Sequence, residues 1–258
     1  MINPLDTISI LLGDCLQQLD NVPDSSVDMI ATDLPYGNKI TDCGWDILIP
    51  FKPLWEQYRR IIKPHGAIVL NATGLFTAQL ILSHVKGFKL AWVWDKAQSG
   101  SFQTAKYRPL QITEDVLIFT RDGERVNYHP IMRKGIMRRK GGQKALERNQ
   151  VAAAQRGGTP VKLSDEYYPV NVVRIPNTRI GNIHPTQKPV ALFEYFIQTY
   201  SQPGDLVLDS CFGSGSSGVA AIRLGRRYIG IERDSHYYQL GGDRIYRELD
   251  TIERQKAA

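Results

Sequence analysis

Short apolar runs alternate with amphipathic stretches along much of the chain. The apolar runs, rich in Val, Ile and aromatic residues, lie at 8–12, 27–32, 66–71, 88–94, 115–120, 206–209 and 228–232. Their lengths and β-branched content predict buried strands rather than helices. Apolar residues at helical spacing predict helices over 53–62, 189–200, 216–224 and 235–249. This alternation predicts an α/β fold with a seven-stranded, mostly parallel sheet flanked by helices.

Two of the predicted strands end in an acidic residue and a tight turn. The run at 27–32 leads into Asp33-Leu-Pro-Tyr-Gly37, and the run at 206–208 leads into Asp209-Ser-Cys-Phe-Gly-Ser-Gly215. In open α/β sheets, ligands bind where buried parallel strands end. The sequence therefore predicts two sites at the same edge of the sheet.

Residues 121–183 interrupt this alternation. They hold 13 Lys and Arg against 5 Asp and Glu, a balance of +8, so the rest of a chain of net charge +6 carries −2. Such a concentration of positive charge is typical of a face that binds a polyanion, although a solvated basic loop has the same composition. We predict an insertion outside the sheet. The residues spaced to meet phosphates are Arg133, Lys134, Arg138, Arg139, Lys140, Lys144 and Arg148.

Length and cysteine usage restrict the class of protein. A chain of 258 residues can bury one substantial core. No apolar stretch approaches the roughly 18 residues of a membrane span, and no secretory signal precedes the first strand. The three cysteines are odd in number and have no CxxC spacing, which argues against a disulfide framework or a zinc site. We expect a cytoplasmic protein without a metal ion.

The second turn begins a glycine loop. Gly213-Ser-Gly215-Ser-Ser-Gly218 matches the pattern GxGxxG, which lets a ligand approach the backbone and directs the N–H groups of the next helix towards it. Glu232, at the end of the following strand, is placed to accept hydrogen bonds from two ribose hydroxyls. This arrangement suits both NAD and S-adenosylmethionine.

Two features favour S-adenosylmethionine. Only 26 residues follow Glu232, too few for the further strands of a dinucleotide-binding fold. The charge of Asp209 would repel a pyrophosphate and attract the ammonium group of a methionine moiety. The missing strands lie at the start of the chain, and Asp14 follows the first of them. The Asp14 carboxylate is placed to accept a hydrogen bond from the adenine amino group of the cofactor, to cap a helix near Leu16, or both. The order of blocks predicts a circularly permuted, Rossmann-like sheet.

The first turn suits methyl transfer to an exocyclic amine. The amine lone pair is delocalised into the base, and acceptors of its N–H hydrogen bonds favour the geometry needed for attack. The Asp33 carboxylate and the Leu34 carbonyl are such acceptors, and Pro35 makes the turn rigid. Tyr36 offers a ring for stacking on a base extruded from a duplex. A simple proline-containing turn is the alternative interpretation of these residues taken alone.

Together these blocks resemble the beta-class amino-group DNA methyltransferases, most closely the N6-adenine enzymes of phages and restriction-modification systems. The resemblance rests on the order DLPYG, a basic segment, His184-Pro-Thr-Gln-Lys-Pro189, DSCFGSGSSG and Ile229-Gly-Ile-Glu232. It implies a catalytic half over 1–120, a target recognition region over 121–183 and a cofactor-binding half over 184–258. It also implies base flipping in duplex DNA. As partners we further expect a second copy of the chain, in a homodimer, and a cognate restriction endonuclease.

The resemblance assigns residues to each site. The catalytic residues are Asp33, Leu34, Pro35 and Tyr36. The residues expected at the S-adenosylmethionine site are Asp14, Cys15, Asp33, His184, Thr186, Gln187, Lys188, Asp209, Phe212, Gly213, Gly215, Ser216 and Glu232. Trp94-Asp95-Lys96 and Glu114-Asp115 also resemble the family, without a chemical role that we can assign.

The identity of the substrate depends on small differences. Asp33 in the first catalytic position, where Ser also occurs, favours adenine over the N4 of cytosine. Leu34 replaces the commoner Pro, but only its backbone is needed. A cytosine-C5 enzyme is disfavoured because no cysteine follows a proline. Cytosine-N4 methylation, a protein-glutamine methyltransferase and an inactive DNA-binding protein remain as alternatives.

Overall fold

A computed structural model describes residues 6–37, 44–99, 102–140, 162–177, 181 and 183–257. Contacts divide the described residues into two units, one from 1–129 and 171–258 and one from 130–170. The larger unit holds an eight-stranded sheet, and the smaller holds a two-stranded sheet.

The strands are β1 (Ile8–Leu12), β2 (Val27–Thr32), β3 (Ile62–Ala72), β4 (Phe88–Asp95), β5 (Thr113–Phe119), β6 (Arg133–Lys140), β7 (Lys162–Tyr167), β8 (Val172–Arg174), β9 (Leu206–Asp209) and β10 (Arg227–Glu232). The helices are α1 (Cys15–Gln18), α2 (Phe51–Ile61), α3 (Leu75–Ser83), α5 (Val190–Tyr200), α6 (Ser216–Arg223) and α7 (Ser235–Ala257), with 3-10 turns η1 (Leu19–Asn21) and η2 (Phe102–Thr104).

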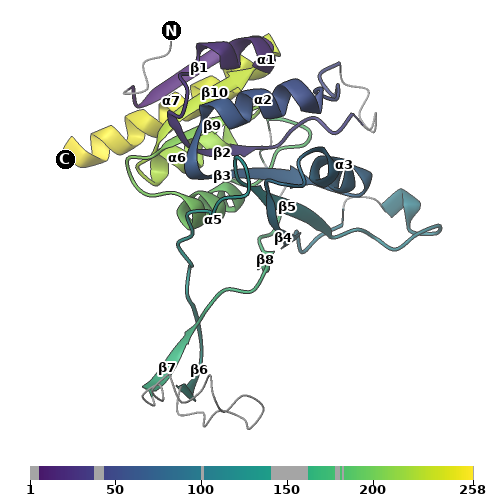
Figure 1. Cartoon of the computed structure of the whole chain (residues 1–258), viewed down its shortest axis with the longest axis vertical. Coiled ribbons are helices and arrows are strands. Elements are labelled where there is room, and N and C mark those ends of the chain that lie inside the picture. The colour runs from purple at the N-terminus through teal and green to yellow at the C-terminus, as the bar shows by residue number, and fades with distance from the viewer. Residues whose placement is uncertain are drawn as a thin grey trace. The chain divides into compact units, whose positions relative to one another are not determined.

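The large sheet has the strand order β1-β10-β9-β2-β3-β5-β4-β8. The C-terminal strands β9 and β10 therefore lie between the N-terminal strands β1 and β2 (Figure 1). All neighbouring pairs are parallel except those that β5 makes with β3 and β4. This arrangement confirms the permuted, mostly parallel fold.

The sheet differs from the prediction by one strand. Val172–Arg174 pairs in parallel with the end of β4 and forms an eighth strand, so this part of 121–183 does not lie outside the sheet. A run of three residues, with only Val173 buried, is too short to give a readable apolar pattern.

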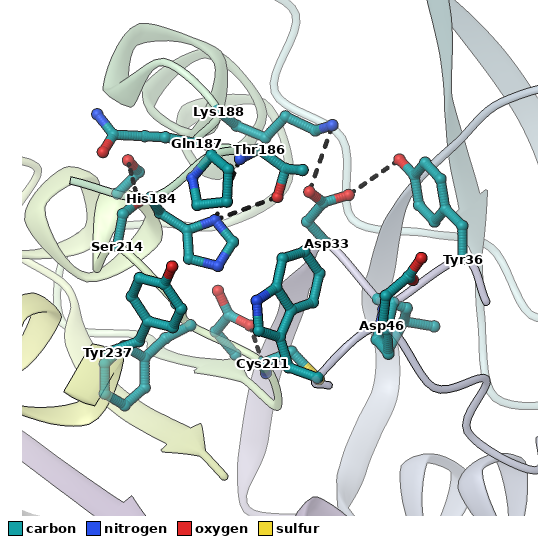
Figure 2. A pocket seen from close by; sticks show the side chains of 18 of the residues that line it. Asp33, Tyr36, Asp46, His184, Thr186, Gln187, Lys188, Cys211, Ser214 and Tyr237 are labelled. Atoms are coloured by element: carbon teal, nitrogen blue, oxygen red, sulfur yellow. Dashed lines mark hydrogen bonds and ion pairs between the residues drawn. The ribbon is translucent and has the colours of Figure 1, made fainter. Parts of the chain in front are cut away.

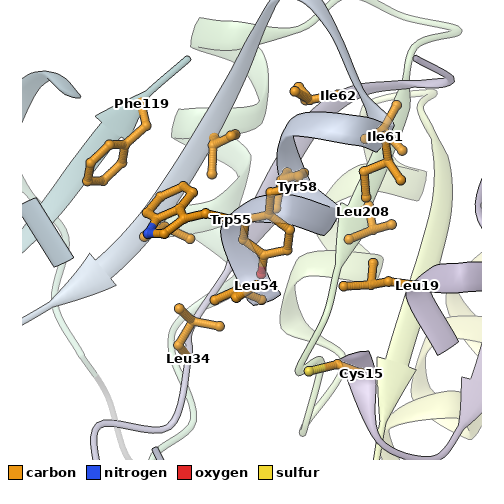
Figure 3. Close-up of a cluster of buried hydrophobic side chains, with 14 of the residues drawn as sticks. Cys15, Leu19, Leu34, Leu54, Trp55, Tyr58, Ile61, Ile62, Phe119 and Leu208 are labelled. Carbon is orange, nitrogen blue, oxygen red and sulfur yellow. The ribbon is translucent and has the colours of Figure 1, made fainter. Parts of the chain in front are cut away.

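Neighbouring residues of each strand point to opposite sides of the sheet, and helices cover both sides. Leu206 and Leu208 of β9 join a cluster with α1 and α2, whereas Val207 joins a cluster with α5 and α6. Figure 3 shows the first cluster, in which Trp55 and Tyr58 of α2 lie over the sheet. Burial on both faces explains the nearly continuous apolar runs of the central strands.

The sheet reverses its winding direction between β2 and β9. From β9 the chain crosses to β10 on one side, and from β2 it crosses to β3 on the other. The carboxyl ends of β2 and β9 are adjacent, with Ile30 level with Leu208. Such a switch point opens a crevice at the strand ends, and both turns singled out in the sequence lie there.

Candidate active site

The two strand-end turns are joined by a buried polar network. Asp209, at the end of β9, accepts hydrogen bonds from the Thr32 hydroxyl of β2 (2.6 Å), the Cys211 N–H (2.9 Å) and the Ser217 hydroxyl of α6. Burial raises the pKa of the Asp209 carboxyl to about 6, although these hydrogen bonds oppose the shift. Three protein donors already engage this carboxylate. Its geometry therefore supports a role in holding the two turns together more directly than the expected contact with an ammonium group.

The glycine loop turns sharply between β9 and α6. Gly215 has φ +75°, and a Cβ there would lie 2.6 Å from the carbonyl oxygen of Gly241 in α7. The Gly213 N–H donates to Glu232 Oε2 at 2.9 Å, and the Asp234 N–H donates to Glu232 Oε1 at 2.8 Å. Glu232 thus fixes the loop, and it also lines a cavity at the strand ends. Burial raises the pKa of its carboxyl.

The structure shows one of the two roles predicted for Asp14, that of a helix cap. Its carboxylate accepts from the Leu16 N–H at 2.9 Å and so caps α1. Asp14 and the buried Cys15 also line the cavity. The cap therefore does not remove Asp14 from the predicted adenine contact.

Asp33 lies between Tyr36 of its own turn and Lys188 from a distant part of the chain (Figure 2). The Tyr36 hydroxyl donates to Asp33 Oδ1 at 3.0 Å, and Lys188 Nζ lies 3.3 Å from Asp33 Oδ2. One face of the Tyr36 ring stacks on Phe76 of α3, with ring centroids 4.7 Å apart, which fixes the plane of the ring. Contacts from Lys188 and Phe76 therefore hold the Asp33 and Tyr36 side chains in place, which a simple proline-containing turn does not require.

Lys188 connects Asp33 to a second acid that the sequence left without a role. Its Nζ lies 2.9 Å from Glu114 Oε2, and Lys96 Nζ lies 3.0 Å from Glu114 Oε1. Asp33, Lys188, Glu114 and Lys96 therefore form one alternating chain of charges. Lys188 is buried, and an isolated buried ammonium would be costly, so both carboxylates are needed around it.

The electrostatics of this charge network favour the ionised forms of Glu114 and Lys188, whereas the net shift at Asp33 favours its protonated form. Burial raises the pKa of the Asp33 carboxyl and Glu114 adds to the shift, while the Lys188 charge and the Tyr36 hydrogen bond oppose it. Burial also acts on Glu114, but Lys188 and Lys96 outweigh it and lower the pKa of that carboxyl. For Lys188, the surrounding acids outweigh burial and raise the pKa well above its ordinary value.

His184 lies in an aromatic setting on the opposite side of the cavity. Its ring centroid lies 4.9 Å from that of Trp45 and 4.2 Å from that of Tyr237. Burial lowers the pKa of the His184 imidazole to about 4, so the ring is neutral at pH 7. Its Nδ1 lies 3.1 Å from the Thr186 hydroxyl, and the Gln187 carboxamide oxygen accepts from the Ile183 N–H at 3.1 Å.

A single cavity of about 400 Å³ brings the two predicted sites together. Every predicted catalytic residue lines it, and so does every predicted cofactor residue except Gly215, which bends the chain behind it. The lining residues that the sequence analysis missed include Trp45, Arg108, Gln111, Asn177 and Tyr237, whereas Lys96 and Glu114 had been noted without a role. The sequence could have indicated a role for Glu114 and Lys96, because both are charged residues at the ends of predicted buried strands, where a charge needs a partner.

The sequence profile of the DNA methylase family matches residues 27–242. The chain belongs to this family. The match runs from β2 into α7 and includes both strand-end turns. It confirms the prediction of an amino-group DNA methyltransferase.

Two relatives of the DNA methylase align with it over most of both chains. DNA adenine methyltransferase YhdJ of Escherichia coli K12 is 29% identical over 96% of this chain and 85% of its own length. Type II methyltransferase M.HpaI of Haemophilus parainfluenzae is 27% identical over 95% of this chain and 76% of its own length.

Solved structures support the fold of the methylase. The M1.HpyAVI–SAM complex matches with a TM-score of 0.61 at 23% identity, covering 92% of this chain and 99% of that chain. The cytosine-N4-specific PvuII DNA methyltransferase matches with a TM-score of 0.65 at 17% identity, covering 96% of this chain and 93% of that chain.

The cavity of the methylase fits S-adenosylmethionine by the chemistry of its lining. Gly213 lines it with φ +47°, a backbone conformation that other residues rarely adopt. Acidic groups at Asp14 and Glu232 suit amine and hydroxyl donors rather than phosphates. The neutral His184 ring adds no positive charge against a sulfonium. The described residues contain no group of three or more metal-ligating side chains, and no helix among them is long and apolar enough to cross a membrane.

The smaller unit of the methylase is a basic hairpin. Its strands β6 and β7 pair antiparallel, and the Tyr167 hydroxyl donates to the Ile136 carbonyl at 2.7 Å. Lys134 pairs with Asp165 and Glu166, each at 3.4 Å, so its charge is partly balanced. The side chains of Arg133, Arg138 and Arg139 are exposed, as the phosphate-binding prediction requires. Lys140 ends β6, and Lys144 and Arg148 lie outside the described residues.

Proposed function

We propose that this DNA methylase transfers a methyl group from S-adenosylmethionine to the exocyclic N6 of an adenine that is extruded from duplex DNA. The observation that carries the proposal is the position of Asp33. It lies in the same cavity as the glycine loop, and Tyr36 and Lys188 hold its carboxylate. S-adenosylmethionine, when bound, supplies a methyl group on a positively charged sulfur.

The cofactor side of the cavity is formed by the glycine loop and the His184 segment. Glu232 is suited to the ribose hydroxyls, and Asp14 to the adenine amino group of the cofactor. Cys15, Phe212, Ser216, Thr186 and Gln187 complete the expected contacts. Asp209 contributes by fixing the loop to β2 through Thr32.

The acceptor side is formed by the tetrapeptide. The Asp33 carboxylate and the Leu34 carbonyl accept the two N–H groups of the target amine, which turns the nitrogen lone pair towards the methyl group. Tyr36 stacks on the flipped base, a contact worth about 1–3 kcal/mol. The new N–C bond would form as the sulfur–methyl bond breaks, with S-adenosylhomocysteine as the leaving product. The amine would then carry the positive charge, and its proton would leave to Asp33 or to water.

Lys188 keeps Asp33 in its accepting state. A protonated carboxyl would present a donor to one of the amine N–H groups, and the adjacent ammonium opposes that protonation. We therefore assign Lys188 to the catalytic side of the cavity as well as to the cofactor contact expected from the resemblance.

The adenine assignment has two supports. Asp33 occupies the first position of the tetrapeptide, and the relative YhdJ is named as a DNA adenine methyltransferase. Cytosine-N4 methylation is the second candidate, since a cytosine-N4-specific enzyme shares the fold. Membership of the DNA methylase family disfavours a protein-glutamine substrate.

The remaining parts of the proposal concern organisation and partners. We assign 1–120 and 184–258 to the two halves of the methyltransferase domain and 121–183 to target recognition, with the exposed arginines of β6 on the phosphates. A homodimer, a cognate restriction endonuclease and a cytoplasmic location remain predictions.

Transfer from S-adenosylmethionine with a tritiated methyl group to duplex DNA tests this proposal. The purified protein should label DNA from a methylation-deficient host, and the label should co-elute with N6-methyl-2′-deoxyadenosine after digestion to nucleosides. The Asp33→Ala variant is the matched control and should give none. Label in neither preparation, with cofactor binding intact, would contradict the proposal.

A further inference from the structure

The connection between β4 and β5 carries two large aromatic side chains into solvent. Phe102 is 71% exposed and Tyr107 is 86% exposed, so neither contributes to the core. Figure 1 shows this connection extending outward from the sheet. Exposed aromatic residues that gather beside a functional cavity are a common mark of an interaction surface.

Hydrogen bonds give this connection a defined shape. The Lys96 N–H donates to the Ile112 carbonyl at 2.9 Å and closes its base. At its tip, the Tyr107 N–H donates to the Thr104 carbonyl at 2.9 Å, and Arg108 Nε donates to the Thr104 hydroxyl at 3.3 Å. A turn held in this way can present Phe102 and Tyr107 at a low entropic cost on binding.

The same connection forms part of the cavity lining. Gln98, Ser99, Arg108 and Gln111 line the cavity that contains Asp33. The Gln111 carboxamide nitrogen donates to Thr73 Oγ1 at 2.6 Å, so the side chain is fixed at this position. Phe102 and Tyr107 therefore belong to the same connection as these lining residues, and Tyr107 directly precedes Arg108 in the sequence.

The charge of the connection favours a polyanion. Residues 96–113 contain Lys96, Lys106 and Arg108 and no acidic residue. Lys96 is engaged with Glu114, which leaves Lys106 and Arg108 at the exposed tip. A protein partner or a second copy of this chain would not specifically require positive charge beside a base-binding cavity, whereas DNA would.

We propose that residues 102–111 form a second DNA-contacting surface, separate from the basic segment 121–183. Phe102 and Tyr107 stack on bases left exposed when the target nucleotide is extruded, and Lys106 and Arg108 contact the flanking phosphates. Extrusion breaks the stacking of the target base on its neighbours, and aromatic side chains can replace part of that stacking. This inference rests on the proposed function.

Equilibrium binding to a fluorescein-labelled duplex of mixed sequence, followed by anisotropy, tests the surface. In the full-length protein with S-adenosylmethionine, Phe102→Ala combined with Tyr107→Ala should weaken duplex binding about tenfold. Cofactor affinity, measured by calorimetry, should not change. Tyr246→Ala on α7 removes another exposed aromatic side chain and serves as the matched control, with unchanged DNA affinity.

Salt dependence gives a second readout. Lys106→Gln combined with Arg108→Gln should reduce the slope of log affinity against log salt by about 2, since each phosphate contact contributes about 0.9. This change does not depend on correct stacking.

The outcomes separate this inference from the proposed function. If the wild-type protein binds no duplex, both fail. If it binds and both double variants match it in affinity and salt slope, the surface is not a DNA contact and the proposed function stands. If the aromatic variant changes only the sedimentation coefficient, the surface joins copies of the chain, and the inference is overturned.

Discussion

Lys188 Nζ lies 3.3 Å from Asp33 Oδ2 and 2.9 Å from Glu114 Oε2. One buried ammonium therefore joins the Asp33-Leu-Pro-Tyr36 turn after β2 to the start of β5. Lys188 precedes α5, so three separate parts of the chain must be in place for this contact to form.

Asp33→Ala removes the carboxylate that we propose as the acceptor for the N–H groups of the target amine. We expect methyl transfer to fall by at least about a thousandfold, because orientation and electrostatic stabilisation are lost together. Binding of S-adenosylmethionine, measured by calorimetry, should be largely retained. Asp243→Ala, at an exposed position of α7, controls for general effects of removing an acid. Normal turnover by the Asp33 variant would refute the catalytic assignment.

Glu114→Gln tests the indirect role of the Glu114 carboxylate. Without that charge, Lys188 pairs with Asp33 alone, and the pKa of Asp33 falls because Glu114 no longer raises it. In a plot of methyl-transfer rate against pH, the acid limb should move to lower pH. The rate at neutral pH should fall about tenfold, because the Lys188 side chain changes position. Asp115→Asn alters the neighbouring β5 acid, which accepts from Thr77, and should leave the acid limb in place. An unmoved limb in the Glu114 variant would show that this acid only supports the fold.

Gly215→Ala places a Cβ where the backbone has φ +75° and where the Gly241 carbonyl oxygen is 2.6 Å away. The backbone conformation alone should cost about 1–2 kcal/mol of unfolding free energy, and the close contact adds to it. Chemical denaturation measures the loss. Gly44→Ala, with open space around its Cβ, should be neutral and is the matched control. Equal stability of the two variants would mean that the loop is not held as described.

His184 gives stability a specific pH dependence. Its folded-state pKa of about 4 lies below the unfolded value of 6.5, so the unfolded chain binds more protons between these values. The contribution of His184 to stability is therefore complete above about pH 6.5 and is lost as pH falls towards 4. Urea unfolding of the wild type and of His184→Gln at pH 5 and pH 7 measures it. The wild type should lose more stability than the variant on going to pH 5; equal losses would contradict a depressed pKa.

The sequence was sufficient for the parts of the site that depend on local pattern. The runs at 27–32 and 206–209 are β2 and β9 as predicted, and their end turns meet because parallel strands end at one edge. The same local pattern predicts the glycines of the loop and Glu232, because the loop directly follows β9 and Glu232 ends β10.

Other parts of the site depend on contacts between distant segments. Lys188 and Glu114 are 74 positions apart, and no periodicity indicates their pairing. Trp45 and Tyr237 meet His184 from opposite ends of the chain, so their part in the cavity follows only from the folded arrangement. Leu75–Ser83 was not predicted as a helix, because exposed Leu75 and Leu82 blur its apolar stripe.

Nucleoside mass spectrometry on DNA from a methylation-deficient bacterial host that expresses this chain tests the central claim most directly. The account predicts N6-methyladenine, present with the wild-type chain and absent with Asp33→Ala. N4-methylcytosine in its place would keep the mechanism and overturn the assignment of the base. No modified base, despite a folded protein that binds S-adenosylmethionine, would contradict the claim that this chain methylates DNA.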